Sequence, residues 1–424
     1  MKAIHTALSL IAIAAATACS TTDKTAATQP TAHVLAVVDP GHFHAALVTK
    51  SPVSALADTI HLYAPEGPEV RQYLGFIDSY NSRSDNPTSW TVDSCISPDF
   101  LQAFMADSVA DIVVLAGNNR NKTDYILEAI RAGKNVLADK PMAIDAAGFE
   151  KLVEAYRLAD EKGLVIRELM TERYDTLNIF ARQMLNSGYI GTPLCDSVIP
   201  TVEMTSVHHF FKEVSGSPLK RPEWYYDVEQ QGEGIADVTT HLIDLIMWQC
   251  FPNETIDWQK DIEVIDATHT PTIITPEEYF RSTGATISEP ISVYANGNIL
   301  ARIKDILVSL NVRWDFEAPV GAGDTFSAIY RYTDGQLHIL QDKNTGYSKD
   351  IFIYKDDEMT SAEDEFIRII IPDSVRSGHE EHFNRVTDSF LRSLDGEPMP
   401  QWDAANTLAK YRLTTEAVDR AHSK

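Results

Sequence analysis

The sequence predicts an α/β protein: an N-terminal doubly wound parallel sheet, followed by an α+β domain with a large, mostly antiparallel sheet. Three observations lead to this fold class. First, 424 residues exceed the roughly 250 to 300 at which one hydrophobic core stops growing, so two domains are expected. Second, residues 33–165 alternate short apolar runs with helical patterns. Third, residues 291–340 alternate apolar and polar positions between turn signals.

The parallel sheet is predicted from three continuous apolar runs, Val34–Val38, Ile60–Tyr63 and Ile112–Ala116. Such runs are typical of parallel strands that are buried on both faces. Between later strands, Asp145 is expected to cap a helix whose apolar residues recur with helical period up to Gly163. In a sheet of this kind, ligands bind at the carboxyl ends of the strands.

The antiparallel sheet is predicted from strand-like runs with turns at Asn296-Gly297 and Asp334-Gly335. Gly321–Phe326 (GAGDTF) matches part of a kinase motif in which a helix N-terminus faces phosphates. The residues that follow alternate like a strand, so we interpret this segment as a turn.

The N-terminus has the pattern of an export signal. Lys2 precedes an apolar run over residues 7–18, and Ala16-Thr17-Ala18-Cys19 resembles the lipobox of bacterial lipoproteins, with a plain signal peptide as the alternative. The predicted layout is a signal peptide (1–19), a flexible tether (20–32), a dinucleotide-binding domain (33–165) and a substrate-binding and oligomerisation domain (166–424). We expect an exported protein, anchored by a lipid on Cys19 to a bacterial membrane and facing the periplasm.

Charge and cysteine content exclude other classes. The net charge of -25 repels phosphate backbones, which argues against nucleic acid as a partner. The remaining cysteines, Cys95, Cys195 and Cys250, are odd in number and widely spaced, which argues against a disulfide framework and predicts buried thiols.

The turn after the first predicted strand is the expected place for a dinucleotide pyrophosphate. It contains Gly41, His42, Phe43 and His44, of which only Gly41 survives from the usual G-x-G-x-x-G pattern. The histidines could bond to phosphate, form an H-x-H metal pair, or be ordinary polar loop residues. Glu66 is the nearest acid after the second strand, and the choice between NAD and NADP stays open.

Residues 109–144 closely resemble the Gfo/Idh/MocA family, whose equivalent stretch ends one strand in T-P-N-x-x-H and another in E-K-P. By this resemblance Asn119 lies beside the cofactor, and Lys122 replaces the family histidine. Asp139, Lys140 and Pro141 match E-K-P, which implies a lysine between nicotinamide and substrate and a cis peptide bond before the proline. A surface lysine before a turn proline is the structural alternative.

Residues 232–248 resemble a second family motif, G-G-x-x-x-D-x-G-x-H-x-x-D. Asp237, His241 and Asp244 recur at i, i+4 and i+7, so they share one face of a helix. The resemblance implies that Asp237 and His241 contact substrate and that the histidine takes the hydroxyl proton. Taken alone, this pattern is more often a helix cap or a surface pair.

Further pocket residues are expected near this motif. His208 and His209 are adjacent, so on a strand they would face opposite sides, and at most one would belong to the site. Arg221 and the aromatic residues after it could line a sugar pocket. No ligand set has recognisable metal spacing. The predicted substrate contacts are Arg173, Tyr174, His209, Lys212, Trp224 and Asp244.

Together these features predict an enzyme that transfers hydride between NAD or NADP and a hydroxyl of a sugar-like substrate, with dimers or tetramers as the resemblance implies. His241 would be the base, Lys140 would polarise the reacting oxygen, and Asp237 would orient His241 or bind a neighbouring hydroxyl. Export implies a tightly bound cofactor. Two alternatives remain: a retained-cofactor, redox-neutral glycosidase or epimerase, and a non-catalytic sugar-binding lipoprotein.

Overall fold

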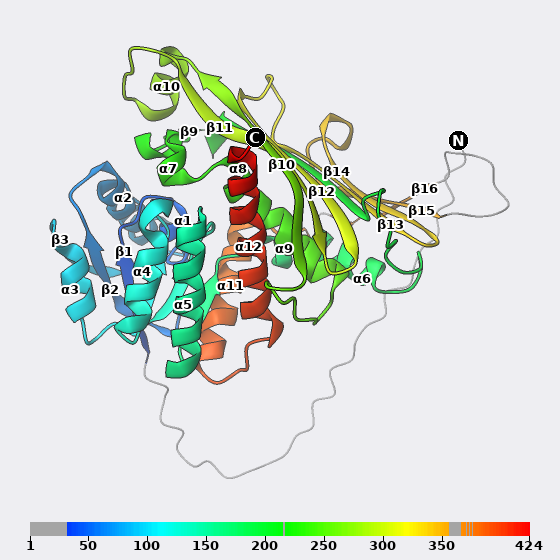
Figure 1. The fold of residues 1–424 in the computed structure, drawn as a ribbon. Helices are drawn as coiled ribbons and strands as arrows, with labels where there is room; N and C mark the ends of the chain where they lie inside the picture. The colour runs from blue at the N-terminus through cyan, green and yellow to red at the C-terminus, as the bar shows by residue number, and fades with distance from the viewer. Residues whose placement is uncertain (1–31, 215–216, 356–365, 370, 373, 375) are drawn as a thin grey trace, which may run out of the picture. The chain divides into compact units, whose positions relative to one another are not determined.

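The first part of the chain forms a six-stranded sheet (Figure 1). All its strand pairs are parallel, in the order β3-β2-β1-β4-β5-β6, which confirms the doubly wound fold. The computed structural model describes residues 32–214, 217–355, 366–369, 371–372, 374 and 376–424. The strands of this sheet are β1 (His33–Val38), β2 (Leu56–Ala64), β3 (Thr91–Ile96), β4 (Ile112–Leu115), β5 (Asn135–Ala138) and β6 (Ile166–Glu168).

Helices connect these strands. Asp145 caps α5 through a hydrogen bond from the Gly148 amide, and the helix ends at Gly163 in the left-handed conformation, as predicted. The helix after β1 has only four residues, which is short for the phosphate-facing helix of a doubly wound fold. The helices are α1 (His44–Leu47), α2 (Pro68–Ser82), α3 (Phe100–Ala106), α4 (Asn119–Arg131) and α5 (Ala146–Lys162).

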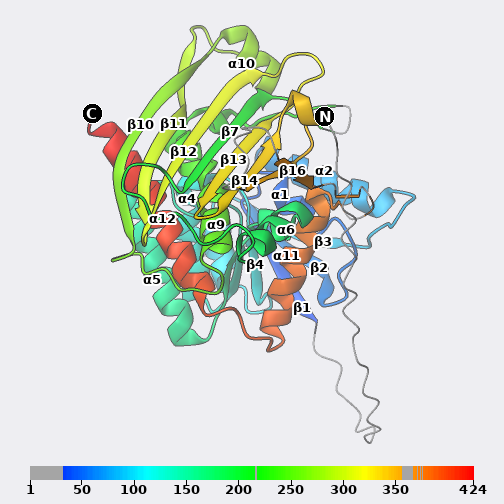
Figure 2. The ribbon, with the colours of Figure 1, turned by 90° about the vertical axis from the view of Figure 1, so that its right-hand side faces the viewer.

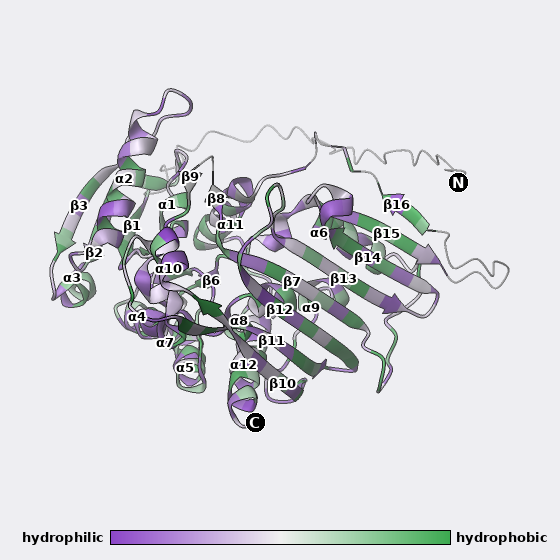
Figure 3. Ribbon diagram, turned by 90° about the horizontal axis from the view of Figure 1, so that it is seen from above, coloured by the Kyte–Doolittle hydropathy of each residue, from purple (hydrophilic) through white to green (hydrophobic). Residues whose placement is uncertain are grey.

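The second part of the chain forms an eight-stranded sheet in the order β10-β11-β12-β7-β13-β14-β15-β16. Only the β12–β7 pair is parallel, so the sheet is mostly antiparallel, as predicted. Figure 3 shows apolar and polar residues alternating along these strands. The strands are β7 (Val202–Phe211), β10 (Ile262–Ile274), β11 (Ile291–Ile303), β12 (Ile306–Glu317), β13 (Thr325–Tyr332), β14 (Gly335–Gln341), β15 (Asp350–Lys355) and β16 (Phe366–Ile369), with a separate hairpin of β8 (Glu213–Val214) and β9 (Ser217–Pro218).

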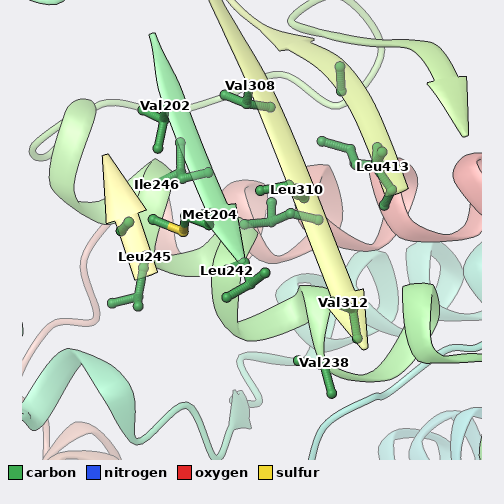
Figure 4. Packing of buried hydrophobic residues seen from close by; sticks show 14 of the residues in the cluster. Val202, Met204, Val238, Leu242, Leu245, Ile246, Val308, Leu310, Val312 and Leu413 are labelled. Carbon is green, nitrogen blue, oxygen red and sulfur yellow. The ribbon is translucent and has the colours of Figure 1, made fainter. Parts of the chain in front are cut away.

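One face of this sheet packs on helices. Met204 of β7 and Leu310 of β12 face Leu242 and Ile246 of α9 and Leu413 of α12 (Figure 4). The helices and short 3-10 turns of this part are η1 (Glu172–Tyr174), α6 (Thr176–Leu185), η2 (Glu223–Tyr226), α7 (Val228–Gln231), α8 (Gly234–Asp237), α9 (Thr239–Cys250), α10 (Pro276–Thr283), η3 (Lys343–Thr345), α11 (His379–Leu394) and α12 (Trp402–His422).

The last two helices join the two sheets. α12 contacts both β10 and α5, and Figures 1 and 2 show it along the second sheet. Phe383 and Phe390 of α11 are buried in the core of the first sheet, and the hydroxyl of Tyr411 in α12 accepts a hydrogen bond from the Met142 amide beside β5. Residues 33–424 thus form one compact unit, and the predicted boundary near residue 165 stays a prediction.

Two sequence predictions are wrong. Asn296-Gly297 is no turn but lies inside β11, where glycine is needed because a Cβ at Gly297 would lie 2.2 Å from Ile235. Cys195 is exposed, because it lies in a surface loop before β7, while Cys250 is buried and Cys95 is half-buried; all three are free. The predicted signal peptide, the lipidated Cys19 and all of the tether except residue 32 lie outside the described residues, within which no helix is both long and apolar enough to span a membrane.

Candidate active site

Lys140, in the loop after β5, and Asp237, at the end of α8, meet in an ion pair. Lys140 follows β5 across a cis Lys140–Pro141 bond, which confirms the prediction for this proline. Its Nζ lies 2.5 Å from Oδ1 of Asp237; the Asp237 side chain is buried, and that of Lys140 is 15% exposed. Burial alone would raise the pKa of Asp237, but the Lys140 ammonium holds it below its usual value. The site therefore contains a fixed cation with its own counter-ion.

His241 lies one helical turn after Asp237, where α8 leads into α9. Burial, and then the charge of Lys140, lower the pKa of His241 to about 3, while Glu172 and Asp237 oppose this shift. The imidazole is therefore neutral near pH 7. Neither ring nitrogen bonds to a described residue, and Nδ1 is buried without a partner. Asp237 does not orient His241: its second oxygen accepts from Gln231 Nε2 at 3.0 Å.

His42 and His44, in the turn after β1, both contact Asp139. Each Nδ1 lies 3.0 Å from a carboxylate oxygen. Burial lowers the pKa of His42 and takes that of His44 to about 4, so both rings are neutral near pH 7 and can donate to the carboxylate. Burial opposes ionisation of Asp139, but His44 and His42 hold its pKa well below the usual range. The ligand atoms lie within 4.8 Å of one another, which is also compatible with an H-x-H metal pair.

The same turn lies against two neighbours. The amides of Gly41 and His42 both donate to the Ala116 carbonyl, at 3.1 and 3.0 Å, so they are not free for phosphate. A Cβ at Gly41 would lie 3.1 Å from the ring of Trp224, and one at Gly117 would lie 2.1 Å from the Asp39 carbonyl. Glycine at both positions is what lets the turns after β1 and β4 approach each other.

The other residues predicted to bind the cofactor, Asn119, Lys122, Phe43 and Glu66, do not form one cluster of contacts. Asn119 donates to the Gln231 carbonyl at 2.7 Å, and its own oxygen accepts from Lys122 at 2.5 Å. Lys122 is buried and also donates to the Pro141 carbonyl at 3.2 Å; burial lowers its pKa to about 8. Lys122 therefore holds the backbone next to Lys140 through the Pro141 carbonyl, and Asn119 holds the Lys122 ammonium. Phe43 is partly buried and packs against the hydrophobic core of the first sheet. Glu66 is exposed and pairs with Arg71.

Arg173 and Asp244 belong to a buried ion-pair network. Arg173 bonds Asp244 at 2.7 and 2.6 Å and Asp403 at 2.8 Å, and Asp244 also pairs with Lys410 at 3.0 Å. We predicted that Arg173 and Asp244 bind substrate. In the structure the two side chains bond to each other and to other residues of the protein. Arg173 and Tyr174 line a cavity of about 260 Å³ whose lining includes neither Lys140 nor His241.

His208, His209 and Lys212 gather around Asp324. Nδ1 of His208 lies 3.3 Å from Oδ2, Nδ1 of His209 lies 2.9 Å from Oδ1, and Lys212 Nζ lies 2.8 Å from Oδ2. The expectation that only one histidine could reach a common group is wrong. Asp324 directly precedes β13, whose Thr325 pairs with Val207, so the carboxylate lies level with His208 and offers one oxygen to each ring.

Sequence reasoning missed Asp324, Gln231 and Gly117. The turn interpretation of GAGDTF is confirmed, since β13 begins at Thr325, but the aspartate of that motif is a site residue. Asp324 carried a signal, because it is the aspartate of the segment that matches part of a phosphate-binding motif. Gln231 carried none, because its contacts with Asn119 and Asp237 depend on how two distant segments meet.

Comparison with known proteins supports the same architecture. A family model described as "Oxidoreductase family, NAD-binding Rossmann fold" matches residues 24–168. A second, described as "Putative oxidoreductase C terminal domain", matches residues 194–367 and 354–422. A solved structure from Parabacteroides merdae, described as a "putative oxidoreductase", is 36% identical with a TM-score of 0.90, covering 92% of this chain and 98% of that one.

Two curated relatives are dehydrogenases. D-xylose 1-dehydrogenase (NADP(+)) of Hypocrea jecorina is 38% identical over 21% of this chain and 22% of its own length. Inositol 2-dehydrogenase of Acidothermus cellulolyticus is 33% identical over 37% of this chain and 39% of its own length. The matches thus span less than half of these relatives. The two family models together cover the first sheet and almost all of the second part, and on that ground the chain belongs to the Gfo/Idh/MocA family of NAD(P)-binding oxidoreductases.

Proposed function

We propose that the protein transfers hydride between NAD(P) and a hydroxyl-bearing carbon of a sugar or glycoside. The observation that carries the proposal is the meeting of Lys140 from the first sheet with Asp237 and His241 from the second part. Oxidation of a carbinol needs a base and a positive charge at the same oxygen. The similarity to xylose and inositol dehydrogenases supports a polyhydroxyl substrate.

We call the region bounded by Gly41, Gly117, Lys140 and His241 the crevice, and it is the place proposed for a dinucleotide. Strand order reverses between β1 and β4, which is where open α/β sheets bind nucleotides. Gly41 and Gly117 lie at the ends of these strands, and Glu66 follows β2 at the place of a ribose-binding acid. His241 Nδ1 is a buried polar atom without a partner, as expected where a ligand completes the site. When bound, the nicotinamide supplies hydride exchange.

Asp237, Lys140 and His241 each have a different role in the proposed reaction. Asp237 positions the Lys140 ammonium, which stabilises negative charge on the reacting oxygen. His241 accepts the hydroxyl proton in its neutral form. Because a base whose pKa is about 3 is weak, it removes that proton only if the oxygen's developing charge is stabilised, and this makes Lys140 and His241 interdependent.

Variants at the two residues test the proposal. Lys140→Met and His241→Asn should each lower the rate of NAD(P) reduction about 10²- to 10⁴-fold, measured by absorbance of the reduced nicotinamide with a panel of sugars and cyclitols. Lys151→Met is the matched control, because Lys151 is an exposed lysine on α5 that pairs with Asp124. A rate within threefold of wild type in either site variant would contradict the assignment.

A second candidate is a redox-neutral glycosidase or epimerase that retains its cofactor. The contacts between α4 and α7 favour it: Asn118 bonds Gln230 at 2.7 Å, Asn119 bonds Gln231, and Trp224 lies on Gly41. A segment closed over the crevice in this way would slow cofactor exchange. Mass spectrometry of material released from purified protein, and product formation without net reduction of added NAD, would separate this candidate from a dehydrogenase.

The chain's assembly and location complete the proposal. Thr205, Ser309 and Asn311 alternate with buried neighbours on the face of the second sheet opposite α9, and we infer that this face forms dimers or tetramers. Sedimentation analysis of the oligomeric state would test this inference.

We further infer export and lipid anchoring at Cys19, on the strength of the N-terminal pattern alone.

A further inference from the structure

Arg221 is a buried arginine without a carboxylate partner. Its side chain is 7% exposed, and Nε donates to the Phe210 carbonyl at 3.2 Å. The guanidinium stacks on Tyr225 at 4.4 Å and lies 6.0 Å from the ring centre of Trp314. Among the side chains that the structure describes, no acid lies within ion-pair distance of Arg221, and its two terminal nitrogens donate to none of them.

The other buried arginines and two lysines of the site are paired with acids, whereas buried Lys122 bonds only to neutral oxygens. Of the buried arginines in the described parts of the chain, Arg167 and Arg173 both pair with Asp403, and Arg173 also with Asp244. In the crevice, Lys140 is paired with Asp237 and Lys212 with Asp324. The positive charge of Arg221 is likewise not compensated by any described carboxylate. A buried charge of this kind is costly to fold unless a partner arrives from outside.

The position of Arg221 points to the crevice. Trp224, three residues along the chain, lies against Gly41 in the turn after β1. After burial and other neighbours, the charge of Arg221 contributes to the lowered pKa of His42 and to that of Lys212. Arg221 thus lies in electrostatic range of the dinucleotide turn on one side and of the Asp324 cluster on the other.

The dinucleotide turn is poorly equipped to bind an anion by itself. The Gly41 and His42 amides are used by Ala116, and the helix that follows has only four residues. An arginine offers two parallel donors that match the oxygens of a phosphate or a carboxylate. Arg221 supplies both the charge and the donors that the turn lacks.

We propose that Arg221 is an oxyanion-binding residue of the crevice, which holds either the pyrophosphate of the cofactor or an acidic group on the sugar. This inference rests on the proposed function, because it places a ligand in the same site. It makes the charge of the ligand, and not only its hydroxyl groups, a determinant of binding.

Binding measurements on purified protein test the inference. We would titrate wild type, Arg221→Met and Arg221→Lys calorimetrically with NAD⁺, inorganic pyrophosphate, glucuronate and glucose. Arg221→Met should weaken binding of the relevant anion about 10- to 100-fold and leave glucose unchanged, with Arg221→Lys in between. Arg281→Met is the matched control, because Arg281 also stacks on two rings, Phe211 and Phe316, but pairs with Glu317.

The four probes identify the source of the anion. Loss confined to NAD⁺ and pyrophosphate assigns the site to the cofactor, and loss confined to glucuronate assigns it to the substrate. Binding of all three anions within twofold of wild type in Arg221→Met overturns the inference, and so does a wild-type protein that binds none of them.

Thermal unfolding without ligand separates binding from a structural role. Removal of an uncompensated buried charge should leave the melting temperature of Arg221→Met equal to or above that of wild type. A clear decrease shows an arginine kept for packing and overturns the inference. Because none of these measurements needs turnover, a wild type that binds through Arg221 but transfers no hydride refutes the proposed function alone.

Discussion

The low pKa of His241 predicts that this residue makes the protein sensitive to acid. Its pKa is lowered from 6.5 to about 3 by burial and then by Lys140, so the folded protein binds fewer protons than the unfolded chain between these values. The free energy of unfolding must then fall as the pH falls through this window. At pH 5 the unfolded imidazole is protonated about thirtyfold over its neutral form, which corresponds to a loss of about 2 kcal/mol relative to pH 7.5.

Urea unfolding of wild type and His241→Asn at pH 7.5 and pH 5 measures this loss. The difference between the two pH values should be about 2 kcal/mol smaller in His241→Asn, whatever the stability of the variant itself. Lys140→Met should also reduce it, because removing the ammonium raises the pKa of His241. If wild type and His241→Asn lose the same free energy within about 0.5 kcal/mol, the imidazole is not held neutral and the reasoning is refuted.

Two further predictions follow from single contacts and a third from the N-terminal sequence. Gly117→Ala should destabilise the protein by about 1 to 3 kcal/mol and lower its melting temperature, because the added Cβ would lie 2.1 Å from the Asp39 carbonyl; an unchanged melting temperature would contradict this. Lys410→Met should cost about 3 to 5 kcal/mol in urea unfolding, since it leaves Asp244 with a buried charge that only part of the network balances; a change below about 1 kcal/mol would argue against the network. Cys19→Ser should move the protein from the membrane to the soluble fraction on cell fractionation, and continued membrane association would refute the lipid anchor.

Much of the fold was predictable because its signals are local. The runs Val34–Val38 and Ile112–Ala116 are strands since buried parallel strands are apolar at every position, and Asp145 caps a helix by bonding an amide three residues away. The turn prediction at Asn296-Gly297 failed for a tertiary reason: glycine is required there by Ile235 from another segment.

The sequence by itself identified the candidate catalytic residues Lys140, Asp237 and His241, because they lie in motifs whose spacing is visible along the chain. Only the tertiary structure decided their partners. Asp237 pairs with a lysine 97 residues away and not with the histidine one turn along its helix, and Arg221 is left without an acid. The physical reason is that periodicity reports which face of an element is buried, whereas ion pairing depends on the distance between groups that only folding brings together.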